Sequence, residues 1–321
     1  SMIINESLVA RTFASYVLQL FDGDQPDWLL PMLAVGLIAV AFLVNIAGNA
    51  LIGTVSKIAA ILKVGGILAF AGVALWVSGF SFQPASDSLI DDTSLTGFMA
   101  GVALAILAYK GFTTITNHGA ELRDPKKNLP RSIVLAIAIC AGLYALITVA
   151  VAANLTVPEI VEARDFALAR AADPLFGQAG VALTVGIAVI ATASALLANL
   201  FSVSRLFAML QDMGQVPRGS RWKAQQPLLI TAGLAIVVTV LFDLGQIASL
   251  GVFLYLTMDI AVQWGVLRRL RGDTGARAWP LVATIVLDAI ILGAFTIVTI
   301  GRDPPTLLGA SVICAALCPT Q

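Results

Sequence analysis

Long apolar stretches follow one another along almost the whole of this chain of 321 residues, and they restrict its fold more than any other feature. A helix needs about 20 apolar residues to cross the hydrocarbon core of a bilayer, where every backbone N–H and C=O must be paired internally. Hydrophobic residues make up 59% of the chain and charged residues 12%, against about 25% charged residues in soluble domains. The predicted fold class is therefore all-α, that of a polytopic membrane protein. The apolar stretches cover about residues 5–21, 28–49, 52–80, 95–117, 131–154, 178–209, 227–243, 246–267, 279–300 and 304–318.

Charged residues between the apolar stretches predict how the chain is oriented in the membrane. In two loops every charged side chain is acidic. The alternate loops are rich in Lys and Arg, and these loops are expected in the cytoplasm. Residues 155–177 carry both signs and are expected to form an amphipathic helix across the outer mouth. The first stretch, which contains Glu6 and Arg11, and the short last one are the weakest spans. The acidic loops contain Asp22, Asp24 and Asp27, and Asp87, Asp91 and Asp92; the basic loops contain Arg123, Lys126, Lys127 and Arg131, then Arg218, Arg221 and Lys223, then Arg268, Arg269, Arg271 and Arg277.

The segment from Leu107 to Arg131 points most directly to a function. It starts as an apolar span, reaches Lys110 and Gly111, and continues into a loop with charges of both signs. A lysine at the centre of a membrane helix costs roughly 3 kcal/mol, and glycine weakens a helix by about 1 kcal/mol relative to alanine. Such a pair favours a broken helix that lines a water-filled cavity, where unwound backbone can meet a substrate.

Several motifs follow in a fixed order along the chain. Gly111-Phe112 is followed by Ala120-Glu121-Leu122-Arg123-Asp124-Pro125-Lys126-Lys127-Asn128-Leu129-Pro130-Arg131. Asn45 and Gly48 lie at the end of one span, Phe166–Ala169 precede another, and Ser204–Met209 with Gly214–Pro217 close it. In combination these motifs resemble those of amino acid permeases of the amino acid–polyamine–organocation superfamily, and the resemblance covers essentially the whole chain.

The resemblance implies an inverted five-helix-repeat transporter fold. Family members usually have twelve spans, and their charged loop follows the sixth span, whereas here it follows the fourth. The chain therefore looks like helices three to twelve of one transporter domain, with the N-terminal two helices missing, and we interpret it as a fragment. A natural ten-span protein is the alternative. On this interpretation residues 1–80 are the remainder of the first repeat, residues 95–267 are the second repeat, and residues 279–318 are two C-terminal helices.

The same resemblance implies where a substrate binds. The first helix of each repeat is broken near the bilayer midplane, and here only the second repeat's break is present, at about residues 108–114. Carbonyls at the end of its outer half suit a substrate ammonium, and N–H groups at the start of its inner half suit an anion. The residues carried over as substrate-binding are Ala108, Tyr109, Lys110, Gly111 and Phe112; the alternative is that the two aromatics only pack.

Two lysines in apolar surroundings require a partner or a role. Lys110 departs from the family pattern; it either snorkels to the membrane surface or pairs with an acid, and Asp259 is the candidate partner. Lys63 lies on a helix where some proton-coupled members carry a lysine in place of a bound sodium ion. We hypothesise that Lys63 faces Thr192 and Ser194 and exchanges a proton during transport. Snorkelling is the alternative, although Lys63 lies about 9 Å deeper than Lys57 at 1.5 Å per residue.

The function that these features favour is secondary active transport of amino acids, coupled to protons. An exchanger of amino acids or amines without ion coupling, and a non-transporting membrane subunit or sensor, are the alternatives. The sequence has no nucleotide motif, no metal constellation and no nucleophile–base pair, so we expect neither an enzyme nor a cofactor or metal site. The basic loops reflect topology and not nucleic-acid binding, and Gly65-Gly66 fit close helix packing. The expected location is the cell membrane, as a multi-pass protein of a bacterial or archaeal inner membrane, with the lipid bilayer and a small amino acid or amine as partners.

Overall fold

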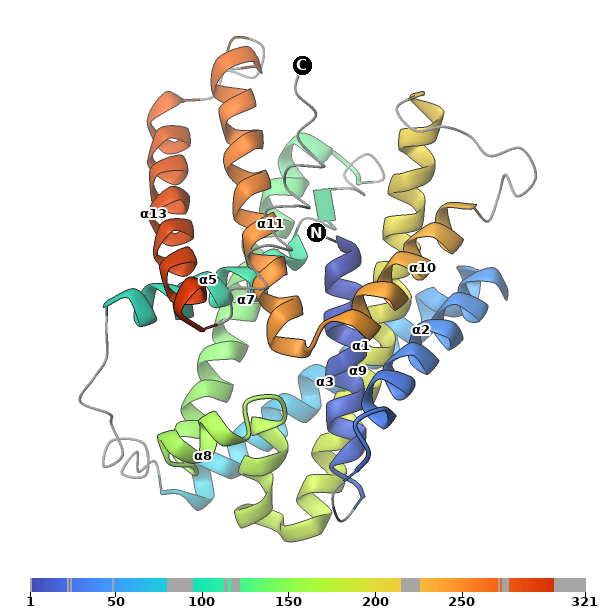
Figure 1. The fold of residues 1–321 in the computed structure, drawn as a ribbon, viewed down its shortest axis with the longest axis vertical. Helices are drawn as coiled ribbons and strands as arrows, with labels where there is room; N and C mark the ends of the chain where they lie inside the picture. Colours follow the sequence, from blue (N-terminus) through green and yellow to red (C-terminus); the bar gives the residue numbers. More distant parts are fainter. Residues whose placement is uncertain are drawn as a thin grey trace. The chain divides into compact units, whose positions relative to one another are not determined.

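The computed structural model describes residues 2–21, 23, 25–47, 49–79, 95–112, 115–116, 122–214, 226–270, 272 and 277–302. Every regular element within these ranges is helical (Figure 1). The elements are α1 (Met2–Leu18), α2 (Leu29–Ala47), α3 (Asn49–Val77), α5 (Leu95–Tyr109), η1 (Lys110–Phe112), α7 (Pro125–Ala152), α8 (Val157–Glu162), α9 (Ala167–Asp212), α10 (Gln226–Leu241), α11 (Leu244–Gly265), η3 (Val266–Leu270) and α13 (Ala278–Arg302).

The prediction of an all-α, multi-pass membrane protein is confirmed. In the described part of the chain, seven helical segments are long and apolar enough to cross a membrane. The helices α1, with 17 residues, and α10, with 16 residues, are shorter. The predicted span at 304–318 lies outside the described residues. The seven segments are Leu29–Ala47, Lys57–Val77, Leu95–Phe112, Pro125–Ala152, Ala167–Gln211, Leu244–Leu270 and Ala278–Gly301.

One helix starts earlier than its apolar stretch. α7 begins at Pro125 and not near residue 131, so that Pro130 lies inside the helix. Pro125 is well placed at the first helical position, because the N–H group that proline lacks has no intrahelical partner there. Asp124 precedes the helix in the left-handed conformation, with φ of 48°. The basic residues between 126 and 131, which were expected in a loop, therefore lie in the first two turns of α7.

Residues 155–177 do not form the single amphipathic helix that the sequence predicted. They form α8 and the beginning of α9, which leaves helical geometry at Gly177 (φ 58°, ψ −151°) just before the predicted span. The first turn of α8 is closed by Glu159, whose Oε2 accepts hydrogen bonds from the Thr156 hydroxyl at 2.7 Å and the Thr156 N–H at 2.8 Å. These two bonds lower the pKa of Glu159, because they stabilise its charged form.

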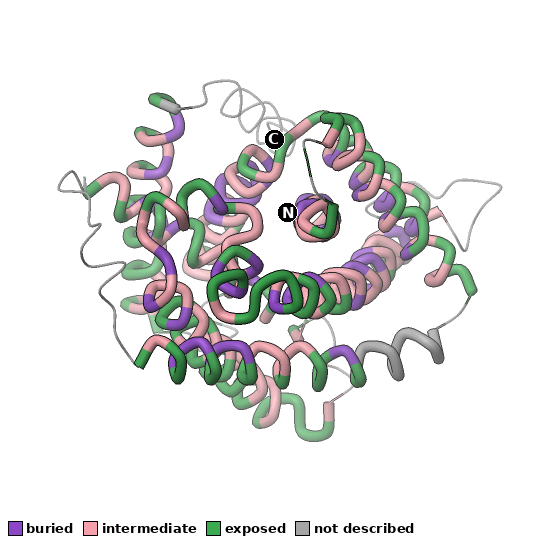
Figure 2. The backbone as a smooth tube through the Cα atoms, turned by 90° about the horizontal axis from the view of Figure 1, so that it is seen from below, coloured by how far each residue is buried: buried purple, intermediate pink, exposed green. Residues whose placement is uncertain are grey.

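Packing divides the chain into two compact units, residues 2–90 with 112–244 and residues 91–111 with 245–321. In the larger unit α1 packs against α2, α9 and α10, and Figure 2 looks nearly along α1. Small residues let helix backbones approach closely. The Ser7 hydroxyl donates to the Ala235 carbonyl at 2.8 Å, and the Arg11 guanidinium donates to the Thr239 carbonyl at 2.8 and 2.9 Å. Small buried residues between these helices are Ala10, Ala14, Ala34, Ala41, Ala232 and Ala235.

A second core of the larger unit lies along α3, which packs against α7 and α9. It contains Phe70, Ala71 and Ala74 of α3 together with Ala150 of α7 and Ala172 of α9. In the smaller unit α13 packs along α5. The rings of Phe253 in α11 and Phe295 in α13 meet edge to face, with centroids 5.1 Å apart. The helices α5, α11 and α13 therefore hold one another within that unit.

Candidate functional site

The regular helix α5 ends at Tyr109, where the sequence predicted a break. A 3₁₀ turn follows from Lys110 to Phe112. The change from α-helical to 3₁₀ hydrogen bonding alters which carbonyls are engaged, and such changes within a helix often mark functional positions. Ala108 and Gly111 are exposed and Tyr109 is half-buried, all within the smaller unit. Phe112 is half-buried and falls in the larger unit, so the five predicted substrate-binding residues do not belong to one packed body.

Lys110 is the most buried residue of the turn, with only 8% of its surface exposed. Its ammonium lies over the ring of Tyr255 in α11, with Nζ 5.5 Å from the ring centroid. A cation over an aromatic face gains about 0.5–2 kcal/mol, and more when water is excluded. This contact gives the lysine a neighbour that the sequence did not reveal. Pairing of Lys110 with Asp259, which lies one turn beyond Tyr255, stays a prediction.

Asp259 takes part in a polar network that joins α11 to α13. The amide nitrogen of Gln263 donates to Oδ2 of Asp259 and, at 3.5 Å, to Oδ2 of Asp288. The amide oxygen of Gln263 accepts a hydrogen bond from the hydroxyl of Thr284. Asp288 is 9% exposed, and sequence reasoning missed it. The available signal was that Asp288 is the one charged residue within the apolar stretch 279–300.

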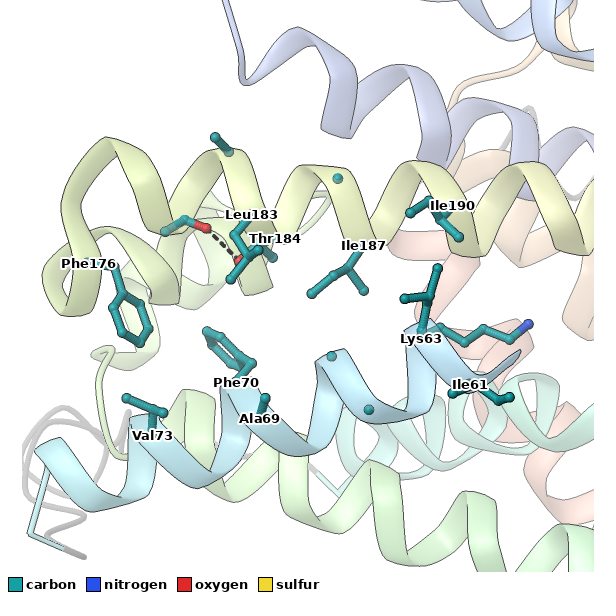
Figure 3. A pocket seen from close by; sticks show the side chains of 16 residues that line it. Ile61, Lys63, Ala69, Phe70, Val73, Phe176, Leu183, Thr184, Ile187 and Ile190 are labelled. Atoms are coloured by element: carbon teal, nitrogen blue, oxygen red, sulfur yellow. Dashed lines mark hydrogen bonds between the residues drawn. The ribbon is translucent and has the colours of Figure 1, made fainter. Parts of the chain in front are cut away.

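Lys63 lies at one end of a groove between α3 and α9 with a volume of about 740 Å³ (Figure 3). Across the groove from α3 are Ile187 and Ile190 of α9. The hydroxyl of Thr192 donates to the carbonyl of Ala188 at 2.7 Å, and the hydroxyl of Ser194 donates to that of Ala191 at 3.0 Å. Both hydroxyls therefore bond to their own helix, and the predicted approach of Lys63 to them stays a prediction.

The arrangement is that of a polytopic membrane protein with an interrupted span and ionisable groups inside the membrane, which is typical of transporters. Residues 2–315 match the sequence model of a family described as amino acid permease. The chain therefore belongs to the amino acid permease family.

Individual relatives extend this result. The chain is 30% identical over 299 residues to the inner membrane transport protein YbaT of Escherichia coli strain K12, which covers 91% of this chain and 68% of YbaT. It is 26% identical over 270 residues to the serine/threonine exchanger SteT of Bacillus subtilis strain 168, covering 80% of this chain and 61% of SteT. A shorter match, 32% identical over 100 residues, covers 30% of this chain and 22% of the branched-chain amino acid permease BcaP of Lactococcus lactis subsp. cremoris. The chain thus spans 68% of the length of YbaT and 61% of the length of SteT.

Proposed function

We propose that this chain takes part in secondary active transport of amino acids, that the break at the end of α5 contributes to the substrate site, and that a proton gradient drives uptake. Membership of the amino acid permease family supports the substrate class. The observation that carries the site is the end of α5 at Tyr109, inside an apolar segment that continues to Phe112.

The chemistry of a helix end explains how such a break recognises an amino acid. The C-terminal end of an α-helix carries a partial negative charge equivalent to about half an electron, which attracts a substrate ammonium. Lys110, the residue that follows this helix end, has its ammonium over the Tyr255 ring. The described residues leave room for a ligand around Gly111, since none of them has an atom within 4 Å of a Cβ atom at this position. We assign Ala108, Tyr109 and Gly111 to the substrate-facing surface.

A binding measurement tests this assignment. The 321-residue chain, and the complete gene product if it is longer, is placed in lipid nanodiscs and titrated with a panel of radiolabelled amino acids. We expect saturable binding of at least one amino acid and a loss of roughly tenfold in affinity, about 1.4 kcal/mol, in Gly111→Val. Gly101→Val is the matched control in the same apolar segment, because Gly101 is also exposed and a Cβ atom there would also meet none of the described residues within 4 Å. Equal affinity of the two variants would exclude Gly111 from the site.

A second candidate function is exchange of two amino acids without ion coupling. The name of the relative SteT, a serine/threonine exchanger, favours it. In liposomes an exchanger takes up labelled substrate only when unlabelled amino acid is present inside. A proton-coupled transporter accumulates substrate in empty vesicles when the outside is more acidic.

A further inference from the structure

The two membrane aspartates of the smaller unit face each other across α11 and α13. Phe253 contacts Phe295, and Gln263 bonds to Thr284, which fixes an antiparallel register between the two helices. In that register Asp259 falls opposite Asp288. Each aspartate lies near the middle of its apolar segment, Leu244–Leu270 and Ala278–Gly301. The pair is therefore deep in the membrane, where a bare carboxylate costs several kcal/mol.

Gln263 brings the two carboxyl groups close together. Its amide nitrogen lies 2.5 Å from Oδ2 of Asp259 and 3.5 Å from Oδ2 of Asp288, so these oxygens are at most about 6 Å apart. The bond from Thr284 to the amide oxygen fixes which end of the amide faces the carboxyl groups, because only the nitrogen end donates. One neutral amide thus holds two acids together but supplies no positive charge.

The charges around the pair do not balance. From α5 and its 3₁₀ turn the titratable groups are Tyr109 and Lys110, and α11 adds Tyr255. On α13 no other titratable residue lies before Arg302 at the helix end. The described segments of this unit therefore place a single embedded lysine with two carboxyl groups. Arg268 and Arg269 lie in η3 at the far end of the α11 segment, and Arg268 lies over the Trp264 ring at 4.8 Å.

We propose that Asp259 and Asp288 form a proton-binding site, in which the two carboxyl groups share one proton and Lys110 balances the remaining negative charge. Two carboxylates at this distance repel each other strongly in a medium of low dielectric constant, and one bound proton removes that repulsion. Release of the proton leaves two negative charges against one lysine, which weakens the contact between α11 and α13. The use of this site in uptake rests on the proposed function, whereas proton binding itself does not.

Infrared difference spectroscopy on the chain in nanodiscs tests the site directly. A protonated carboxyl group gives a C=O stretching band that carboxylates lack, and ¹³C-labelled aspartate assigns it by its isotope shift. We expect an aspartic acid band at neutral pH that is lost in Asp259→Asn and in Asp288→Asn. Asp173→Asn, which changes an exposed carboxyl group on α9, should keep the band. A band that persists in both single variants would overturn the proposal.

A variant of Lys110 tests the same site and does not depend on the folding of the aspartate variants. Lys110→Met removes the balancing charge, so the band should grow as the remaining carboxyl group also binds a proton. An unchanged band in folded Lys110→Met would contradict the role of Lys110 as the balancing charge. Loss of the band when sodium ions are added would contradict a site that binds protons.

Transport separates this proposal from the proposed function. If the wild-type protein accumulates an amino acid under a proton gradient, Asp288→Asn should lose that accumulation. Loss of the band in both aspartate variants without amino acid transport by the wild type would refute the proposed function and support the proton site. Proton-driven transport with a band that neither variant affects would support the proposed function and refute the proton site.

Discussion

Lys110 and Glu6 are both ionisable residues that the fold removes from solvent, but their surroundings differ. Lys110 meets the ring of Tyr255, which lies one helical turn before Asp259 in α11. Glu6 of α1 has no exposed surface, and neither of its carboxylate oxygens has a hydrogen-bond partner among the described residues. A buried polar group without a partner is destabilising, because it loses its hydration and gains nothing in return. Glu6 is therefore a site where the fold gives up stability.

Replacing Glu6 should reveal this cost. We predict that Glu6→Leu raises the free energy of unfolding by about 1–3 kcal/mol, because an apolar side chain of similar size needs no hydrogen bond. Unfolding in mixed detergent, followed by circular dichroism, measures the change. The control is Glu162→Leu at an exposed position of α8, which should change stability by no more than about 0.5 kcal/mol. A strongly destabilised Glu6→Leu would show that the carboxyl group has a stabilising partner.

At the scale of elements, the contact between α3 and α9 depends on one glycine of a pair. A Cβ atom on Gly66 would lie 2.7 Å from Cδ1 and 3.0 Å from Cγ1 of Ile187, whereas a Cβ atom on Gly65 would meet no atom of the described residues within 4 Å. Both glycines line the groove that also contains Lys63. Gly66 thus lets the two helices approach, as the sequence predicted for the pair, while Gly65 leaves open space.

This difference makes the two glycines a matched test. We predict that Gly66→Val lowers the free energy of unfolding by about 1–3 kcal/mol relative to Gly65→Val, because only the first forces Ile187 to move. Adding Ile187→Ala should reduce that difference, and a double-mutant cycle measures the coupling. Equal effects of the two valine substitutions, with no coupling to Ile187, would show that α3 and α9 are not in close contact at this point.

The helices could be predicted from sequence more readily than the contacts between them. The apolar stretches predicted α2, α10, α11 and α13 to within a few residues, because hydrophobic length alone determines where a span fits. Charged residues hid the first turns of α7, where Pro125 starts the helix ahead of the apolar run. The positions of Lys110 over Tyr255 and of Asp288 opposite Asp259 depend on how separate helices pack, and no local pattern specifies that register. The motifs predicted the family correctly because they occur in combination along the whole chain.

At the level of the whole molecule, the two units carry different parts of the chemistry. The chain is a multi-pass membrane protein of the amino acid permease family, and its helices fall into two compact units. The interrupted helix α5 and the aspartate pair both lie in the smaller unit, whereas Lys63 and its groove lie in the larger one. Substrate contact and proton binding are therefore assigned to the same set of helices. That assignment predicts that substrate uptake and proton uptake depend on each other.

The most direct test is uptake into liposomes that contain the reconstituted protein and no internal amino acid. We predict that at least one labelled amino acid accumulates when the outside is more acidic than the inside, and that a protonophore abolishes this accumulation. The physical reason is that the proton gradient supplies the free energy for uphill uptake. Uptake that requires an internal amino acid and does not depend on the proton gradient, or no uptake of any amino acid by folded protein, would contradict proton-coupled transport by this chain.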